Sequence, residues 1–474
     1  MNTPRFFPPR SAFALAACAL LVLAFAPAQY FGRQQDDALY LIGARALAMG
    51  RYCLLTSPGC PPLTMINPAW PALLSPLAWL TEKTGPFQAA SALLLAGLPL
   101  ALWGWLRRRT DEDTALLCAC LFASSPLVLA QSGVVMSEPL FTLALLAMLA
   151  AAESGRALGA GLSAAMMLLT RTAGVSALPA LAAAFLRKDK PREALRAGLP
   201  PLLAFAAWSA WSWSKIHAVD KFSMFSFTYG DNPAAKLARV AAANARYYAG
   251  AWGACFLPPA HADGILAVLL GAALAAAALR GLVLILKRTP RDPAAWALIG
   301  TVLMLGVWGW QYERYMIALL PLLLWTLAAG LGRAAKPALI ALLVLQLGAQ
   351  TLPRLGRPNA WTEPELAKTY AWLASRPKPA LLSSGEPVRD GWLSGLPNLP
   401  LPVADSDEAF AAALKKARVT YVLRVDGQNY GLDADPTAAP RRQLEQAYRR
   451  LEDPKFFRLV HEEPGERATV YEPR

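Results

Sequence analysis

The sequence predicts a polytopic α-helical membrane protein of about 11 transmembrane helices with a soluble α/β domain at its C-terminal end. Hydrophobic residues make up 55% and charged residues only 16% of the 474 residues, a composition too apolar for an ordinary soluble protein. Apolar runs close to the length that crosses a bilayer recur as far as residue 352. Beyond that point charged residues return, and the apolar runs become short.

Clusters of Lys and Arg orient the predicted spans, because cytoplasmic loops carry an excess of cations. Arg5 and Arg10 place the N-terminus in the cytoplasm, and Arg107, Arg108 and Arg109 mark the next cytoplasmic turn. The N-terminal segment is similar to a signal peptide. More spans follow, however, and Pro27 makes a poor cleavage site, so we expect an uncleaved first span. The transmembrane part then covers residues 1–352, with external loops at 30–86 and 214–260. The spans within 140–187 are short for full crossings.

The first external loop has two local features. Residues 67–77 are apolar but short and broken by prolines, which favours a helix lying along the membrane interface over a span. Cys53 and Cys60 share this loop. They form a disulfide in an oxidising compartment or remain two free thiols, and the sequence leaves both alternatives open.

The region 353–474 has the pattern of a small soluble α/β domain outside the membrane. Residues 419–425 predict a strand, and residues 407–418 predict an amphipathic helix. The preferred interpretation of this domain is a packing or lid element without chemistry.

The formal charge of +14 lies in short clusters beside apolar runs, which indicates membrane topology and contact with lipid headgroups. The sequence has no basic groove with interleaved aromatic residues, so no nucleic acid partner is expected.

Three polar features fall on one predicted face of the membrane: Asp36 with Asp37, Ser137 with Glu138, and the Glu313-Arg314 pair. Neighbouring carboxylates can hold a divalent cation such as Mg²⁺ or Mn²⁺, or accept a proton from an attacking hydroxyl group. An arginine at a helix end offers a planar fork to a phosphate. The alternative is structural, because acids also favour helix N-termini, and a lone arginine also serves as a topology signal.

Two further external cations are candidates for phosphate binding. Arg171 follows a predicted span and resembles Arg314 in its setting, although the topology there is less regular. Lys215 begins the second external loop, where solvation of a surface lysine is the simpler interpretation.

The order of short motifs resembles the GT-C class of polytopic glycosyltransferases, close to the bacterial aminoarabinose and dolichyl-phosphate-mannose-type transferases. An acidic pair after the first span is followed by a patterned helix, a proline-bearing interfacial stretch, a Ser-Glu-Pro-Leu-Phe turn and an Arg-Tyr pair before a proline. The matching residues are Asp36, Asp37, Tyr40, Ala44, Leu47 and Gly50, then Pro68 and Pro71, then Ser137 to Phe141, and finally Arg314, Tyr315 and Pro321.

The resemblance covers nearly the whole chain. It implies transfer of a sugar from a polyprenyl-phosphate donor to a glycan, lipid or protein acceptor, by inverting displacement, at the outer face of the bacterial cytoplasmic membrane. It implies that Asp36, with Asp37 beside it, acts as base or metal ligand, that Glu138 is the second acid, and that Arg314 neutralises the departing phosphate. Where some relatives carry Asp-Glu, this chain has Asp36 and Asp37, and their second acid is an Asp in some cases. Metal binding by Asp36 and Glu138 therefore stays open.

Two other classes of function compete with this interpretation. A transporter or flippase for a lipid-linked sugar would also need many spans and an outward-facing charged pocket. Transporters tend to show internal symmetry and polar groups at the bilayer midplane, and the polar residues here cluster at one surface. A membrane-anchored scaffold would leave the three polar loops unexplained.

Overall fold

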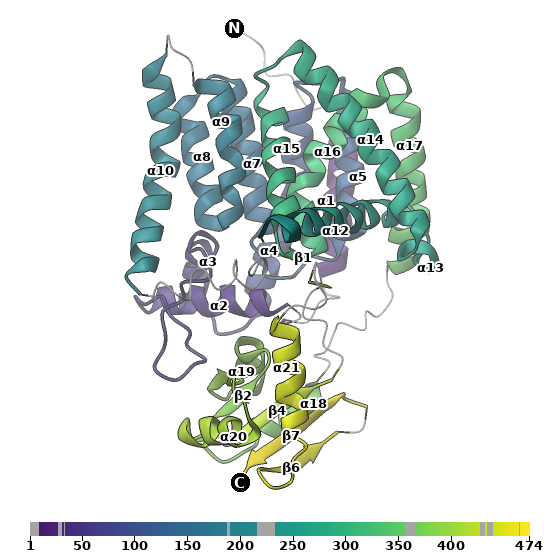
Figure 1. Cartoon of the computed structure of the whole chain (residues 1–474). Helices are drawn as coiled ribbons and strands as arrows, with labels where there is room; N and C mark the ends of the chain where they lie inside the picture. The colour runs from purple at the N-terminus through teal and green to yellow at the C-terminus, as the bar shows by residue number, and fades with distance from the viewer. Residues whose placement is uncertain are drawn as a thin grey trace.

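The structure is a computed structural model that describes residues 9–26, 31–32, 34–186, 190–215, 233–355, 366–426, 432–433, 439–463 and 465–474. A bundle of helices lies at one end and an α/β unit, residues 366–474, lies at the other, as Figure 1 shows. We call the second part the C-terminal unit.

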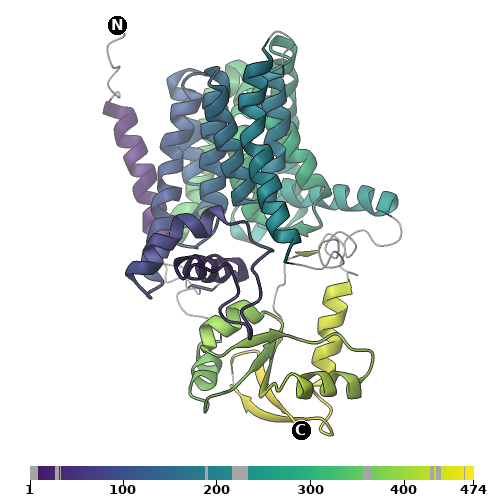
Figure 2. The ribbon, with the colours of Figure 1, turned by 90° about the vertical axis from the view of Figure 1, so that its left-hand side faces the viewer.

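The bundle is built from helices that run roughly side by side in both Figure 1 and Figure 2. They are α1 (Pro9–Phe25), α4 (Gly85–Leu106), α5 (Glu112–Ala123), α7 (Glu138–Glu153), α8 (Ala157–Thr170), α9 (Leu178–Phe185), α10 (Pro191–Trp213), α14 (Ile265–Arg288), α15 (Pro293–Val307), α16 (Met316–Leu331) and α17 (Ala335–Gln346). Short helical pieces lie between these helices or, for η5 and η6, after the last of them: α6 (Pro126–Leu129), η2 (Thr172–Ala177), α13 (Pro259–Ala262), η3 (Glu313–Tyr315), η4 (Gly332–Ala334), η5 (Leu347–Thr351) and η6 (Leu352–Arg354).

Within the described residues, three helical stretches are long and apolar enough to cross a membrane: Gly85–Leu106, Ile265–Arg288 and Glu313–Arg354. Several bundle helices are apolar but shorter, among them Pro9–Phe25, Ala157–Thr170 and Pro293–Val307. The expected class of polytopic helical membrane protein agrees with this architecture. The count of about 11 spans stays a prediction.

Small residues let helices α12 (Pro233–Ala254), α14 and α16 approach closely. A Cβ atom added to Gly281 of α14 would lie 1.9 Å from the carbonyl oxygen of Thr326 in α16, and one added to Gly330 would lie 1.9 Å from that of Ala277. Because these residues are spaced by four on each helix, they form the small-xxx-small interface common in membranes. The same arrangement joins α14 to α12 through Gly253, Ala267, Gly271 and Ala249.

Two helices of the predicted first external loop, α2 (Gln35–Ala48) and α3 (Ala69–Leu80), lie across the end of the bundle that faces the C-terminal unit (Figures 1 and 2). Helix α3 buries Trp70 and Leu74 while Leu73, Trp79 and Leu80 stay exposed. An apolar helix with exposed apolar side chains fits the predicted position along the interface.

The structure bears on two other predictions, the state of Cys53 and Cys60 and the second external loop at 214–260. Cys53 and Cys60 form a disulfide, which decides between the two alternatives. Helix α12 occupies much of the segment 214–260, which the sequence predicts as the second external loop, and it lies across the bundle (Figure 1). Its alanine-rich sequence has high helix propensity, but its polar and charged residues make it too polar to be predicted as a span.

The C-terminal unit contains a five-stranded mixed sheet in the order β3-β2-β4-β7-β6. The central strand β4 (Tyr421–Val425) is parallel to β2 (Leu382–Ser384) and antiparallel to β7 (Ala468–Pro473), with β3 (Asn398–Pro400) and β6 (Phe457–Glu462) at the edges. Its helices are α18 (Ala367–Ala374), α19 (Pro387–Ser394), α20 (Asp407–Lys416) and α21 (Ala439–Arg450). The strand predicted at 419–425 and the helix predicted at 407–418 correspond to β4 and α20.

The C-terminal unit contacts the bundle side of the molecule through α19 and a short strand pair. Val388 of α19 is buried in the same apolar cluster as Leu39 and Leu41 of α2. Strand β1 (Trp310–Gln311), just before η3, pairs with β5 (Leu432–Asp433) of the unit. The unit is therefore held against the helix ends where α2 and η3 lie. Whether residues 353–474 form a separate domain outside the membrane stays a prediction.

Candidate functional site

Four charged side chains from separate segments converge at the end of the bundle that faces the C-terminal unit. Asp36 lies in the first turn of α2, Glu138 begins α7, Arg171 follows α8, and Arg314 lies in η3 before α16. Local sequence explains these positions. Glu138 and Pro139 suit a first helical turn, and the extended backbone of Arg171 ends α8.

The charges alternate and form a continuous network. The Nη2 atom of Arg314 lies 2.5 Å from Oδ2 of Asp36, and its Nε atom lies 3.4 Å from Oε1 of Glu138. The same Glu138 oxygen accepts a hydrogen bond from Nη1 of Arg171 at 2.7 Å. Side-chain exposure is only 3% for Glu138 and 7% for Arg314. Burial of charge is costly unless it is compensated, and here two acids balance two arginines.

Neighbouring side chains fix the orientation of Arg171. Its Nη1 atom also donates to the hydroxyl oxygen of Ser137 at 3.1 Å, and that oxygen lies 2.6 Å from the hydroxyl oxygen of Tyr40. The guanidinium carbon lies 5.2 Å from the ring centroid of Tyr315. These contacts tie α8, α7, α2 and η3 together at one point.

Arg314 is held in a similar way from the other side. Its guanidinium carbon lies 4.4 Å from the ring centroid of Tyr312 and 5.7 Å from that of Tyr315, and Nη1 donates to the side-chain oxygen of Gln34. Stacked and hydrogen-bonded arginine is preorganised for a planar, anionic group.

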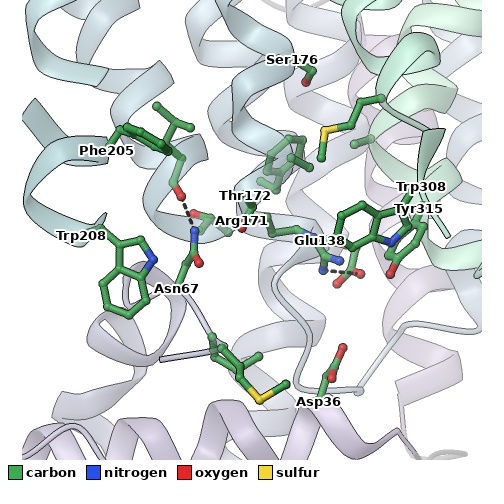
Figure 3. Close-up of a pocket in the computed structure, with 18 of the residues that line it drawn as sticks. Asp36, Asn67, Glu138, Arg171, Thr172, Ser176, Phe205, Trp208, Trp308 and Tyr315 are labelled. Atoms are coloured by element: carbon green, nitrogen blue, oxygen red, sulfur yellow. Dashed lines mark hydrogen bonds and ion pairs between the residues drawn. The ribbon is translucent and has the colours of Figure 1, made fainter. Parts of the chain in front are cut away.

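A cavity of about 800 Å³ opens beside this network. Its polar part is lined by Asp36, Tyr40, Glu138, Arg171 and Tyr315. Figure 3 shows Glu138, Arg171 and Tyr315 close together, with Asp36 below them and the aromatic side chains of Phe205 and Trp208 farther across the cavity. The apolar part also includes Leu168, Trp213, Met304, Leu305 and Trp308. A ligand with an anionic head and an apolar body matches this division.

The remaining predicted site residues, Asp37 and Lys215, do not line the cavity. The carboxylate of Asp37 accepts the backbone N–H groups of Gly32 at 3.0 Å and Ala38 at 2.8 Å. Burial raises the pKa of Asp37 to about 7. Lys215 lies in an exposed turn after α10, two residues beyond the cavity-lining Trp213. Thus Asp36, Glu138, Arg171, Arg314 and Tyr315 come together, whereas Asp37 and Lys215 lie outside this group.

The donor set around Asp36 and Glu138 does not fit a divalent cation in this arrangement. Both carboxylates are already paired with arginines, and two guanidinium groups would repel a metal ion at the same place. In the part of the chain that the structure describes, His, Cys, Asp and Glu side chains form no group of three or more suited to hold a metal.

Sequence reasoning left several contacts unassigned. Tyr40 and Ser137 lie inside the recognised motifs, and Tyr40 follows Asp36 by four residues, which places both on one face of a helix. The four-residue spacing between Asp36 and Tyr40 is the sequence signal that predicts Tyr40 beside Asp36. Asn67 donates its side-chain amide to the carbonyl oxygen of Leu168 at 2.5 Å and ties the first loop to α8. The position of Asn67 before Pro68 does not predict this contact from the sequence.

Fold and site together define a polytopic membrane protein with a balanced charged cavity at one end of its helical bundle. Among solved structures, this chain is similar to Cupriavidus metallidurans ArnT in the apo state, with 10% sequence identity, a TM-score of 0.59 and 97% of each chain covered. The complex of that ArnT with undecaprenyl phosphate gives 11% identity, a TM-score of 0.58 and the same coverage.

The Archaeoglobus fulgidus oligosaccharyltransferase in the apo form is also similar, at 11% identity and a TM-score of 0.56, with 88% of this chain and 69% of that chain covered. It has also been solved with zinc and sulfate. No protein-family model and no curated protein sequence matches. The resemblance to GT-C glycosyltransferases is thereby confirmed for the fold.

Proposed function

We propose that this protein is an integral-membrane glycosyltransferase that moves a sugar from a polyprenyl-phosphate donor to an acceptor of the cell envelope. The observation that carries the proposal is the cavity. Its polar part presents Arg171 beside two acids, and its apolar part is large and rich in aromatic residues. A phosphodiester joined to a polyprenyl chain has both matching parts. The undecaprenyl phosphate bound by the structurally similar ArnT supports this donor class.

In the proposed reaction, a hydroxyl oxygen of the acceptor attacks the anomeric carbon of the donor sugar. The bond between that carbon and the phosphate oxygen breaks, and the electron pair remains on the phosphate. Asp36 takes the proton of the hydroxyl group, since it lines the cavity and keeps 29% side-chain exposure. A single displacement of this kind inverts the anomeric configuration.

The arginines supply the electrostatic part of the mechanism. The phosphate gains a negative charge as the sugar leaves, and preorganised donors stabilise charge that develops in the transition state. Arg171 faces the cavity, while Arg314 lies behind Asp36 and Glu138. We therefore assign the departing phosphate to these two guanidinium groups, with Tyr315 between them. The active site is proposed to face the outside of the cytoplasmic membrane.

The test uses purified protein in detergent with undecaprenyl-phosphate sugars as donors and an envelope fraction from cells lacking the protein as acceptor. Asp36→Asn is expected to abolish sugar transfer while binding undecaprenyl phosphate. Asp426→Asn is the matched control, because this acid pairs with Arg424 at an exposed site in the C-terminal unit. Full transfer by Asp36→Asn would overturn the assignment.

Product analysis separates the transferase from a transporter of lipid-linked sugar. A transferase releases undecaprenyl phosphate in step with labelling of the acceptor. A transporter moves the intact donor across the vesicle membrane and releases no undecaprenyl phosphate. Movement of the donor without release of undecaprenyl phosphate would therefore replace this proposal.

A further inference from the structure

Two polar atoms line the cavity on the wall that lies across from the charged network. Asn67 lies shortly before α3, Trp208 lies in α10, and both side chains line the cavity. Figure 3 shows Trp208 with its indole nitrogen on the side of the ring toward Asn67. Neither residue has a part in the reaction proposed above, so the polar atoms of this wall need another explanation.

The side chain of Asn67 has a fixed orientation and one unused atom. It is 7% exposed, and its amide nitrogen donates to the backbone oxygen of Leu168 at 2.5 Å. Because a carbonyl oxygen only accepts hydrogen bonds, the nitrogen has to face Leu168, and Oδ1 has to point away from it. Among the described residues Oδ1 has no donor, and it is not one of the fully buried atoms that lack a partner. An acceptor atom of Asn67 is therefore accessible from the cavity.

Trp208 is held by two aromatic neighbours that leave its N–H group free. Its ring stacks on that of Trp211 at 5.0 Å between centroids and meets the ring of Tyr52 edge-on at 6.1 Å. The hydroxyl group of Tyr52 donates to the backbone oxygen of Ile66 at 2.8 Å, one residue before Asn67. Within the part of the chain that the structure describes, Nε1 of Trp208 has no acceptor and is not fully buried. Tyr52 thus holds a free donor and a free acceptor in a fixed relation on one wall.

This wall lies close to a cation assigned to the donor phosphate. Leu168, whose carbonyl oxygen binds Asn67, precedes Arg171 by three residues. Three residues of chain span at most about 11 Å even when fully extended. A group joined to a phosphate at Arg171 is therefore within reach of Asn67. Of the two groups that the phosphate of the proposed donor joins, the sugar carries hydroxyl groups and the polyprenyl chain carries none.

We propose that Asn67 and Trp208 bind the sugar of the donor. Oδ1 of Asn67 accepts a hydrogen bond from one sugar hydroxyl group, and Nε1 of Trp208 donates to a hydroxyl oxygen. This inference rests on the proposed transferase function and adds the residues that recognise the sugar. A hydroxyl group both donates and accepts, so a donor and an acceptor on one wall suit a polyhydroxylated ring. A site that hydrogen-bonds a hydroxyl group discriminates against ligands that lack it.

The experiment titrates purified protein in detergent with undecaprenyl phosphate and with undecaprenyl-phosphate mannose, glucose and aminoarabinose. Trp208→Phe keeps an aromatic ring against Tyr52 and Trp211 and removes the N–H group. It is expected to weaken binding of the sugar-carrying lipid that the wild-type protein prefers about fivefold, the effect of one neutral hydrogen bond. Binding of undecaprenyl phosphate is expected to stay unchanged, and Asn67→Ala is expected to show the same selective loss.

Trp296→Phe is the matched control. Trp296 lies in α15, which also contributes to the cavity, but its own side chain does not line the cavity, and its indole nitrogen donates to the backbone oxygen of Pro290 at 2.9 Å. The control therefore makes the same substitution and also removes one N–H donor. It is expected to bind the lipids with and without sugar as the wild-type protein does.

The outcomes separate this inference from the proposed function. Wild-type binding of the sugar-carrying lipids by Trp208→Phe or Asn67→Ala would overturn the inference. An equal loss of binding with and without the sugar would also overturn it, because it would indicate a contact with the lipid or disruption of the cavity. A change in acceptor dependence alone would assign this wall to the acceptor instead. In each of these cases sugar transfer by the wild-type protein still supports the transferase, whereas both proposals fail if it transfers no sugar from any of these donors. Trp208→Phe keeps the test decisive if Asn67→Ala does not fold.

Discussion

Glu138→Gln tests whether the charged network is a set of compensated buried ions. One oxygen of Glu138 serves two guanidinium groups, at 2.7 Å from Arg171 and 3.4 Å from Arg314. Glutamine has nearly the same shape and leaves no cavity, so the variant removes the charge while it keeps one acceptor oxygen for the guanidinium groups. Arg314 keeps Asp36 as a partner, whereas Arg171 keeps only the Ser137 hydroxyl and the Tyr315 ring among these contacts.

The magnitude follows from burial. Removing one partner of a buried ion pair costs about 3–5 kcal/mol, because the other charge stays buried without compensation. The side chain of Arg171 is 17% exposed and Arg314 retains a carboxylate, so we expect the lower end, about 3 kcal/mol. The double variant Glu138→Gln, Arg171→Met is expected to lose less than the sum of the two single variants, since the uncompensated charge is gone.

Unfolding of the purified protein in detergent measures these differences. Asp113→Asn is the matched control. This variant weakens an ion pair with Lys336 in which both side chains are nearly half exposed, and pairs of that kind contribute little. A free energy of unfolding for Glu138→Gln equal to that of Asp113→Asn would refute the reasoning, and so would strict additivity in the double variant.

Two further predictions concern the residues that support the site. The pKa of Asp37 is raised to about 7 by burial, so the folded state binds this proton more tightly than the unfolded state. Its contribution to stability is therefore complete below about pH 4 and is lost as pH rises toward 7. Asp37→Asn is expected to flatten this part of the curve of stability against pH, and an unchanged curve would contradict the assignment. Gly281→Leu is expected to destabilise the protein by about 1–3 kcal/mol or more, because even a Cβ atom would lie 1.9 Å from the carbonyl oxygen of Thr326. Gly104→Leu, where a Cβ atom meets open space, is the control in the same unfolding measurement, and equal effects would refute the packing argument.

The sequence was sufficient for the class of the protein and for the main acids of the site, for physical reasons. Span length, apolar composition and the sidedness of Arg and Lys depend on transfer from water to lipid, which each segment undergoes largely by itself. Asp36, Glu138 and Arg314 were placed on one face by this reasoning, and the structure brings them within one network. The predicted position of α3 along the membrane interface follows from the same principle.

The sequence does not predict the contacts between helix ends, because these contacts depend on how the helices pack. Arg171 looked like an isolated cation, and only the packing of α8 against α7 brings it to Glu138. Helix α12 is too polar to be predicted as a span, and its position across the bundle (Figure 1) depends on packing that the sequence does not reveal. No local pattern in residues 366–474 reveals that α19 docks on α2. Each of these features depends on tertiary structure.

The balanced charge of the network constrains how a donor could bind. Two acids already neutralise Arg171 and Arg314, so a phosphate has to displace a carboxylate from one of them. Of the two carboxylates paired with Arg314, Asp36 is the easier one to displace, because its side chain is 29% exposed while that of Glu138 is 3% exposed. If the phosphate replaces Asp36 at Arg314, donor binding also frees Asp36 to take a proton. Asp36→Asn, which lacks the competing charge, should then bind undecaprenyl phosphate more tightly than the wild-type protein while transferring no sugar. Weaker binding by this variant in a direct titration would show that Asp36 contributes to donor affinity and that the exchange does not occur.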